Sequence, residues 1–180
     1  MLNKKFTPFP ILKTERLTLR QLKIFDQDEI FLLRSDIEIN KYLDRQISNT
    51  IYDARNFINK VVENTNKDAS VYWAITLNAD DKLVGTICLY GFSDGNEKCE
   101  IGYELLTSSQ GKGIMNEAAG KVIDYAFNLI KVQEIEASVH KDNQASISLL
   151  EKLSFKIATK PNDGNNETIY YHLKNSKWQI

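Results

Sequence analysis

The chain of 180 residues is long enough for one domain whose core needs no disulfides or metal to hold it together. Its 23 lysines and arginines nearly balance its 24 aspartates and glutamates, so the formal charge is −1. A dedicated nucleic-acid binder usually carries a basic excess, so we expect no nucleic-acid partner. We expect a single domain over residues 1–180.

Two cysteines, Cys88 and Cys99, lie in apolar, strand-like surroundings without the CxxC spacing of a metal site. We therefore interpret both as small buried side chains and expect no bound metal. No apolar run approaches the roughly 18 residues of a membrane-spanning helix, and residues 1–5 are not followed by a signal-peptide core. These features favour a cytoplasmic protein without a membrane partner.

The first half of the chain predicts a strand, two helices and an antiparallel meander. Strands are indicated by apolar–polar alternation, and helices by apolar residues three and four positions apart. Turn-forming residues at 78–81 and 93–97 separate the meander strands. In chain order we expect a strand at residues 16–22, helices at 26–36 and 50–65, and strands at 71–77, 82–92 and 98–106.

The second half predicts alternating helices and strands. In chain order we expect a helix at residues 114–130, a strand at 134–140, a helix at 143–153, and strands at 155–159 and 168–174 around a turn at 161–164. The complete order predicts an α/β (mixed α+β) fold with a mixed, mostly antiparallel, twisted sheet of about seven strands flanked by about four helices.

The helix at 114–130 is the most informative feature. It carries two interleaved apolar rows, Ile114, Ala118, Val122, Ala126 and Ile130 beside Met115, Ala119, Ile123 and Phe127. Such rows indicate a helix packed on a sheet. Gly111, Lys112 and Gly113 stand just before it and leave backbone N–H groups open to a ligand. Because a helix N-terminus carries partial positive charge, the sequence predicts a phosphate or pyrophosphate site here.

Two known glycine motifs do not match this loop. A phosphate-binding P-loop needs four residues between its glycines and a serine or threonine after its lysine. The Rossmann fingerprint needs a third glycine where Asn116 stands. An ordinary strand-to-helix turn is therefore the alternative to an anion cradle.

Two carboxylates precede the loop on one face of the predicted strand. Glu100, Gly102 and Glu104 point one way because side chains alternate along a strand. A carboxylate beside a binding loop is a candidate general base. The same pattern is equally compatible with an exposed face that has no catalytic role.

The segment 140–146 runs from a predicted strand into a helix. Asn143 or Asp142 would cap that helix, and capping alone would explain either residue. Ser146 lies in the first turns of the helix and could present its hydroxyl to a ligand. His140 is either a base or a structural residue.

Four segments in the right order resemble the GCN5-related N-acetyltransferases, and more narrowly the branch that acetylates ribosomal-protein N-termini and small amines. The segments are residues 14–20, 100–103, 110–118, and 143–146 together with 150–155. The resemblance spans nearly the whole chain. It implies a single domain of that family, with two parallel strands that splay apart to form the cofactor cleft.

The resemblance also implies acetyl-CoA as cosubstrate. Backbone groups of Tyr103, Glu104 and Leu105 would meet the pantetheine arm, much as a sheet edge accepts another strand. Asn143 would meet the arm from the opposite strand. The diphosphate would be held by the signature residues Gln110, Gly111, Lys112, Gly113, Ile114, Met115 and Asn116.

The implied chemistry is direct attack of a primary amine on the thioester. Glu100 or Glu104 would accept the amine's proton, with Glu100 slightly preferred because the branch often carries a glutamate there. Many relatives protonate the departing thiolate with a tyrosine at the position that Leu150 occupies here. Ser146 resembles the serine that some ribosomal-protein acetyltransferases use instead, and the resemblance implies the same role for it.

The sequence departs from the family's pattern at two further positions. Met115 stands where the signature usually ends in glycine or alanine, and its place in the buried row predicts a side chain turned inward. Ser154 replaces the glycine after the last helix. A left-handed conformation there would cost on the order of 1 kcal/mol.

Three functions remain open at this point. The leading hypothesis is an acetyl-CoA-dependent N-acetyltransferase, followed by a CoA-binding module without turnover and by a nucleotide- or phosphate-binding domain. Residues 43–65 and 93–98 would border the acceptor pocket. Their mixed charges allow a protein N-terminus, a polyamine-like amine or an aminoglycoside. The sequence leaves self-association open.

Overall fold

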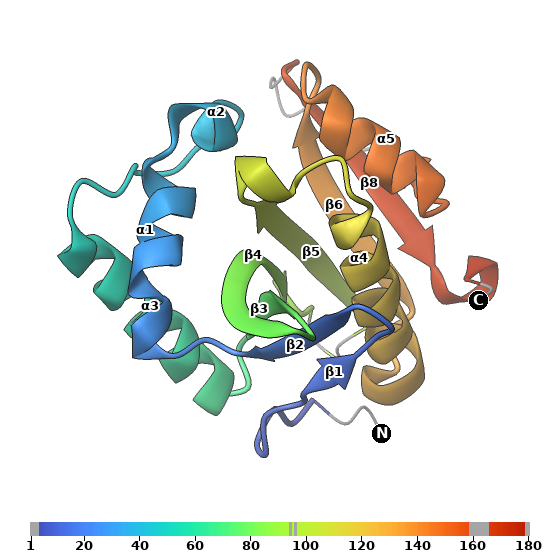
Figure 1. Ribbon diagram of the computed structural model, residues 1–180. Helices are drawn as coiled ribbons and strands as arrows, with labels where there is room; N and C mark the ends of the chain where they lie inside the picture. The colour runs from blue at the N-terminus through green and yellow to red at the C-terminus, as the bar shows by residue number, and fades with distance from the viewer. Residues whose placement is uncertain (1–3, 94, 96, 159–165, 179–180) are drawn as a thin grey trace.

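The computed structural model describes residues 4–93, 95, 97–158 and 166–178. One eight-stranded sheet with the order β1-β2-β3-β4-β5-β6-β8-β7 forms its centre (Figure 1). Every neighbouring pair is antiparallel except β5 and β6, which run parallel. None of the helices within these residues has the length and apolarity to cross a membrane.

The elements have the following bounds. The strands are β1 (Leu12–Lys13), β2 (Leu17–Gln21), β3 (Val71–Leu77), β4 (Asp80–Tyr90), β5 (Lys98–Leu105), β6 (Glu134–His140), β7 (Lys156–Ile157) and β8 (Thr168–Lys174). The α-helices are α1 (Gln27–Ser35), α2 (Ile37–Asn40), α3 (Ile51–Asn66), α4 (Ile114–Tyr125) and α5 (Gln144–Lys152). A π-helical stretch, η4 (Ala126–Ile130), continues α4, and η1 (Ile24–Asp26), η3 (Thr107–Ser109) and η5 (Asn175–Lys177) are short 3-10 turns.

The predicted fold class is confirmed, with an extra strand and an extra helix. The strand β1 has two residues, too few to show alternation, and pairs with β2 through Leu12 and Leu19. The extra helix α2 separates from α1 because the carboxylate of Asp36 accepts the N–H of Glu38 at 2.8 Å and starts a new turn. Of the strand predicted at 155–159, only β7 is a strand among the described residues. The turn predicted at 161–164 lies outside the described residues.

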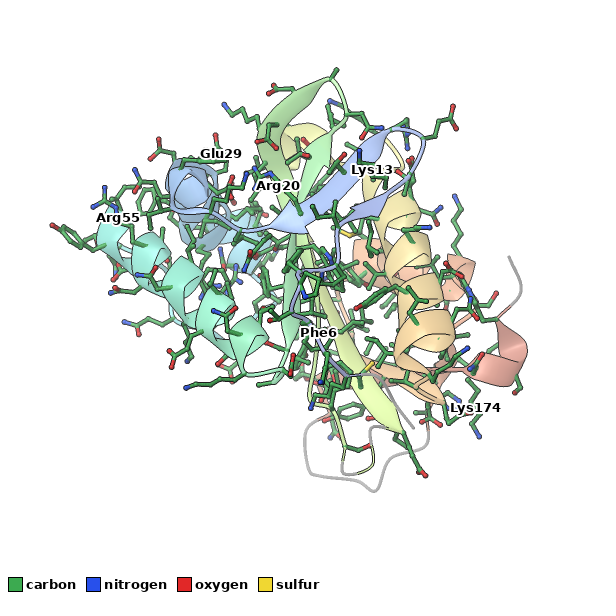
Figure 2. The ribbon with its side chains drawn as sticks, turned by 90° about the horizontal axis from the view of Figure 1, so that it is seen from below. Phe6, Lys13, Arg20, Glu29, Arg55 and Lys174 are labelled. Atoms are coloured by element: carbon green, nitrogen blue, oxygen red, sulfur yellow. The ribbon has the colours of Figure 1, made fainter. Side chains whose placement is uncertain are left out.

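Helices cover both faces of the sheet (Figures 1 and 2). On one face α4 and α5 pack over Trp73, Ile87 and Ile101, and all nine residues of the two predicted rows of α4 are buried. On the other face α1 and α3 pack over Ala74 and Leu83. Alternation along β3 therefore sends the neighbouring residues Trp73 and Ala74 into two different cores.

The parallel pair β5–β6 separates after three residues. Its pairing runs from Lys98 beside Glu134 to Glu100 beside Glu136. From there β5 continues to Leu105, while β6 continues to His140 paired with β8. The divergence leaves a gap in the sheet, called the crevice below, at the carboxyl ends of two parallel strands, which is the usual place for a ligand in α/β sheets. The predicted separation of two parallel strands is confirmed.

A buried ion pair fastens β2 to the turn before α1. The Arg20 guanidinium donates to both carboxylate oxygens of Asp26, at 2.9 and 2.8 Å, and its Nε donates to Asp81 at 2.6 Å (Figure 2). Asp26 is 1% exposed, and its carboxylate also accepts the N–H of Lys23. Taking away one partner would leave an uncompensated charge in the interior.

We expect Asp26→Ala to lower the free energy of unfolding by about 3–5 kcal/mol, because Arg20 would lose its buried counterion and keep only the exposed carboxylate of Asp81. Urea denaturation measures the loss. Asp44→Ala, at an exposed position of the loop after α2, is the control and should leave the midpoint nearly unchanged. A loss for Asp26→Ala no larger than the control's would contradict a structural role for this pair.

Ser154 adopts the left-handed conformation with a φ of 68°, just beyond α5. Its N–H donates to Glu151 O and that of Phe155 donates to Leu150 O, both at 3.0 Å, which closes the helix end. Ser154→Gly should therefore raise the free energy of unfolding by about 1 kcal/mol through relief of the Cβ clash. Chemical denaturation tests this prediction.

The matched control is Ser148→Gly, at an exposed position within α5. It should lower the free energy of unfolding by about 0.5 kcal/mol, because glycine is the poorer helix former. If both substitutions shift stability in the same direction, no strain is stored at Ser154.

Candidate active site

The glycine loop lies at the mouth of the crevice, between β5 and α4. Gly111 and Gly113 have φ values of 72° and 74°, in the region that favours glycine. A Cβ added at Gly111 would meet nothing within 4 Å, so the loop surface there is open. Within the described residues, no acceptor bonds the amides of Gly111, Lys112 or Gly113, and the first amides of α4 lack intrahelical acceptors. The loop thus presents a row of free donors at a helix N-terminus, as an anion site requires.

The segment before β2 holds the loop in place. Glu117 accepts the backbone N–H of Arg16 at 3.0 Å and its Nε at 2.6 Å, and also accepts the hydroxyl of Thr14. The Arg16 Nη1 donates to Lys112 O at 3.0 Å. Burial alone would raise the pKa of the Glu117 carboxyl, but these hydrogen bonds lower it. Sequence reasoning placed residues 14–20 in a strand and did not foresee that Thr14 and Arg16 support the loop.

The crevice itself is bridged by two hydroxyls. A side-chain hydrogen bond joins Tyr103 of β5 to Ser146 of α5. Burial raises the pKa of Tyr103 to about 12, and the bond to Ser146 opposes that rise. Asn143 caps α5 because its Oδ1 accepts the N–H of Ser146 at 3.2 Å. The structure therefore brings together Tyr103, Asn143 and Ser146, three of the predicted site residues.

Glu104 lies on the other face of β5, in a buried polar cluster. Its Oε2 accepts Nη2 of Arg45 at 2.5 Å. Its Oε1 accepts the hydroxyl of Tyr72 at 3.4 Å and that of Thr86 at 3.2 Å. The side chain of Asn40 holds Arg45 in turn, since Asn40 Oδ1 accepts Nε at 2.6 Å. The alternative interpretation of Glu104 as part of an exposed face is wrong, because the residue is 8% exposed.

Glu100 stands where β5 and β6 part. Its Oε2 accepts the Tyr90 hydroxyl at 3.2 Å, and no ion pair neutralises it within the described part of the chain. Four residues separate it from Glu104, which is about 13 Å along a strand. The Glu104 carboxylate is thus paired with an arginine, whereas the Glu100 carboxylate accepts a hydrogen bond from a neutral tyrosine.

A loop between α2 and α3 spans the outer end of the crevice. Arg45 of this loop reaches β5, and the Tyr42 ring stacks on His140 at the end of β6 with the ring centroids 5.2 Å apart. Arg45 lies in the segment 43–65 that was expected to border the acceptor pocket, but the loop has no apolar periodicity, so nothing in the sequence indicated that Arg45 pairs with Glu104 or that Tyr42 stacks on His140. His140, Asp142 and Glu167 hold possible ligand atoms within 4.8 Å of one another, but the carboxylates are exposed and Lys141 already bonds Glu167 at 2.8 Å.

Met115 has the orientation that the sequence predicted. It is buried at 9% exposure in the core beneath α4, so its side chain leaves the loop surface clear. Leu150 is 1% exposed and belongs to the same core. The position at which the resemblance implies a catalytic tyrosine is therefore a core position here.

Comparison with known proteins identifies the family. Residues 16–156 match the family described as an acetyltransferase (GNAT) domain. The uncharacterized N-acetyltransferase p20 of Bacillus licheniformis is 34% identical over 145 residues, which cover 81% of this chain and 82% of that protein. A GNAT-family acetyltransferase from Bacillus anthracis superposes with a TM-score of 0.80 at 25% identity, over 93% of this chain and 99% of that one.

A more distant likeness concerns the fold alone. RimL, a ribosomal L7/L12 α-N-protein acetyltransferase solved with coenzyme A, gives a TM-score of 0.79 at 16% identity, over 92% of this chain and 98% of that one. The family match covers most of the present chain, and the crevice, the glycine loop and the α4 N-terminus all lie inside it. The chain belongs to the GNAT family of acetyltransferases.

Proposed function

We propose that this protein transfers the acetyl group of acetyl-CoA to a primary amine, either a protein N-terminal α-amine such as that of a ribosomal protein or a small-molecule amine. The observation that carries the proposal is the row of unpaired amides from Gly111 to Gly113, set at the mouth of a crevice between parallel strands. RimL, which shares the fold, was solved with coenzyme A. We assign the activity to one domain over residues 1–180.

The loop residues fit the diphosphate of the cosubstrate. Free amides at a helix N-terminus bind anions, and the left-handed glycines keep side chains away from them. The residues that would hold it are Gln110, Gly111, Lys112, Gly113, Ile114, Met115 and Asn116. The ends of β5 and α5, with Tyr103, Glu104, Leu105 and Asn143, would border the pantetheine arm.

We assign the proton transfers to residues near the point where β5 and β6 separate. The cosubstrate supplies the activated acetyl group, and the amine must lose a proton before it attacks. We assign the general base to Glu100 rather than Glu104, because the oxygens of the Glu104 carboxylate already accept hydrogen bonds from Arg45, Tyr72 and Thr86, whereas Glu100 lies where β5 and β6 separate. Ser146, hydrogen-bonded to Tyr103, is positioned to donate a proton to the departing sulfur.

Release of free thiol from acetyl-CoA in the presence of amines tests the function. We expect Glu100→Gln to lower kcat at pH 7 by about 10²-fold or more, with little change in KM for acetyl-CoA, because the general base is lost. The deficit should shrink above pH 8 for α-amine acceptors, whose own pKa is about 7.7–8.0 and which then lose the proton unaided.

Two further variants make this test decisive. Asp28→Asn, at an exposed position of α1 outside the segments expected to border the acceptor pocket, removes a carboxylate elsewhere and should leave kcat unchanged. Glu104→Gln should raise KM for the amine more than it lowers kcat. A pH-independent loss in Glu100→Gln would show that Glu100 is not the base, and absence of thiol release with every amine would refute the acetyltransferase proposal.

A second prediction concerns the cosubstrate site alone. Gly111→Ala should weaken CoA binding about tenfold, because a φ of 72° costs alanine about 1–2 kcal/mol and the loop amides would shift. Gly120→Ala, within α4 and also with open space around its Cβ, should leave the CoA dissociation constant unchanged. Calorimetric titration measures both constants. Equal affinities in the two variants would contradict the assignment of the loop.

A further inference from the structure

Arg34 joins the Glu104 cluster from the last turn of α1. Its guanidinium carbon lies 3.9 Å from the centroid of the Phe57 ring. That ring meets the Tyr72 ring edge-on at 5.4 Å, and the Tyr72 hydroxyl donates to Glu104. A continuous path of contacts therefore connects Arg34 to the carboxylate that Arg45 binds.

The cluster holds more positive than negative charge. Glu104 is its carboxylate, and Arg45 binds it directly. Arg34 has neither an ion pair nor a hydrogen-bond acceptor for its guanidinium among residues 4–93, 95, 97–158 and 166–178. Burial lowers the pKa of Arg34, repulsion by Arg45 adds to the effect and Glu104 opposes it. Arginine nevertheless stays protonated near neutral pH, so one cation lacks a counterion.

Stacking on Phe57 does not by itself account for Arg34. The ring face meets the guanidinium carbon, but a guanidinium carries five N–H donors in its plane, and stacking satisfies none of them. A partly buried cation with unused donors favours an anion that can accept two hydrogen bonds at once, as a carboxylate or a phosphate can. The cluster is therefore complete except for an anion.

We propose that the acceptor amine carries an anionic group, a carboxylate or a phosphate, which Arg34 binds together with Arg45. The inference rests on the proposed acetyl transfer and adds the chemical class of the acceptor. Glu100 lies about 13 Å from Glu104 along β5, so amine and anion would be several bonds apart. A peptide N-terminus with an acidic residue at the second to fourth position has that reach, since an extended chain rises about 3.4 Å per residue.

Matched acceptor pairs test the proposal. One arm uses peptides that carry aspartate or glutamate, or else asparagine or glutamine, at the second to fourth position. The other arm uses amino sugars with and without a phosphate. We expect the anionic member to have a kcat/KM higher by about tenfold or more in at least one arm, because it gains charge-assisted hydrogen bonds. The arm that responds identifies the source of the anion.

Variants tie the preference to Arg34. Arg34→Gln should abolish it mainly through KM for the anionic member, with KM for acetyl-CoA unchanged. Arg34→Lys keeps the charge and should retain part of it, which separates loss of binding from loss of folding. The control is Lys23→Gln, since Lys23 is an exposed cation that also lies over an aromatic ring, that of Phe25, and stands outside the two segments expected to border the acceptor pocket.

The outcomes are distinguishable. Equal use of both members of every pair, or a preference that survives in Arg34→Gln, overturns the inference and leaves acetyl transfer intact. If the protein acetylates none of these acceptors, titration of the same pairs into CoA-saturated protein still tests the inference. Tighter binding of the anionic member that depends on Arg34 supports the inference even then, whereas binding of neither member overturns it.

Discussion

The parting of β5 from β6 after Glu100 is the constraint on which the site depends. β6 stays paired with β8 along its whole length, while β5 stays paired with β4, so the sheet is continuous on either side of the gap. The backbone of β5 after Glu100 and the backbone of β6 after Glu136 are therefore not hydrogen-bonded to each other. Because unpaired backbone groups in an interior are costly, such a gap persists where something else can occupy it. A slender, amide-containing arm has the shape and the hydrogen bonds for that place.

The rest of the molecule holds this gap open. α4 begins directly above it and is fixed at its first turn by Thr14 and Arg16 through Glu117. The buried apolar rows of α4 and η4 anchor this helix to the sheet. On the far side, the loop after α2 touches β5 through Arg45 and β6 through Tyr42. The crevice is thus bounded by contacts from segments far apart in the chain.

Sequence patterns predicted the parts of this arrangement that depend on local periodicity. The rows of α4 and the alternation of β6 extend over enough residues for the pattern to be read, and both elements lie where it placed them. The glycines before α4 predicted open amides, and the structure adds that Gly111 and Gly113 are left-handed. By contrast, β1 spans two residues and α2 depends on one capping carboxylate, so neither leaves a periodic signal.

The contacts that distinguish Glu100 from Glu104 were not available from the sequence. Alternation correctly put both carboxylates on one face, but that face is covered by α1 and α3, and only the fold shows it. Arg45 lies 59 positions before Glu104 in a loop without periodicity. Ion pairs between residues so far apart in the sequence form only when the chain folds, and the sequence around each residue does not indicate its partner.

The two glutamates have different surroundings although they lie on one face of one strand. The Glu104 carboxylate is enclosed, because it accepts hydrogen bonds from Arg45, Tyr72 and Thr86. The Glu100 carboxylate accepts the Tyr90 hydroxyl and lies where β5 leaves β6. In the mechanism that we propose, Glu104 would organise charge around the acceptor and Glu100 would take up its proton. Four positions of β5 would thus separate acceptor binding from proton uptake, and the alternation of the strand keeps both side chains on the side of the sheet opposite α4.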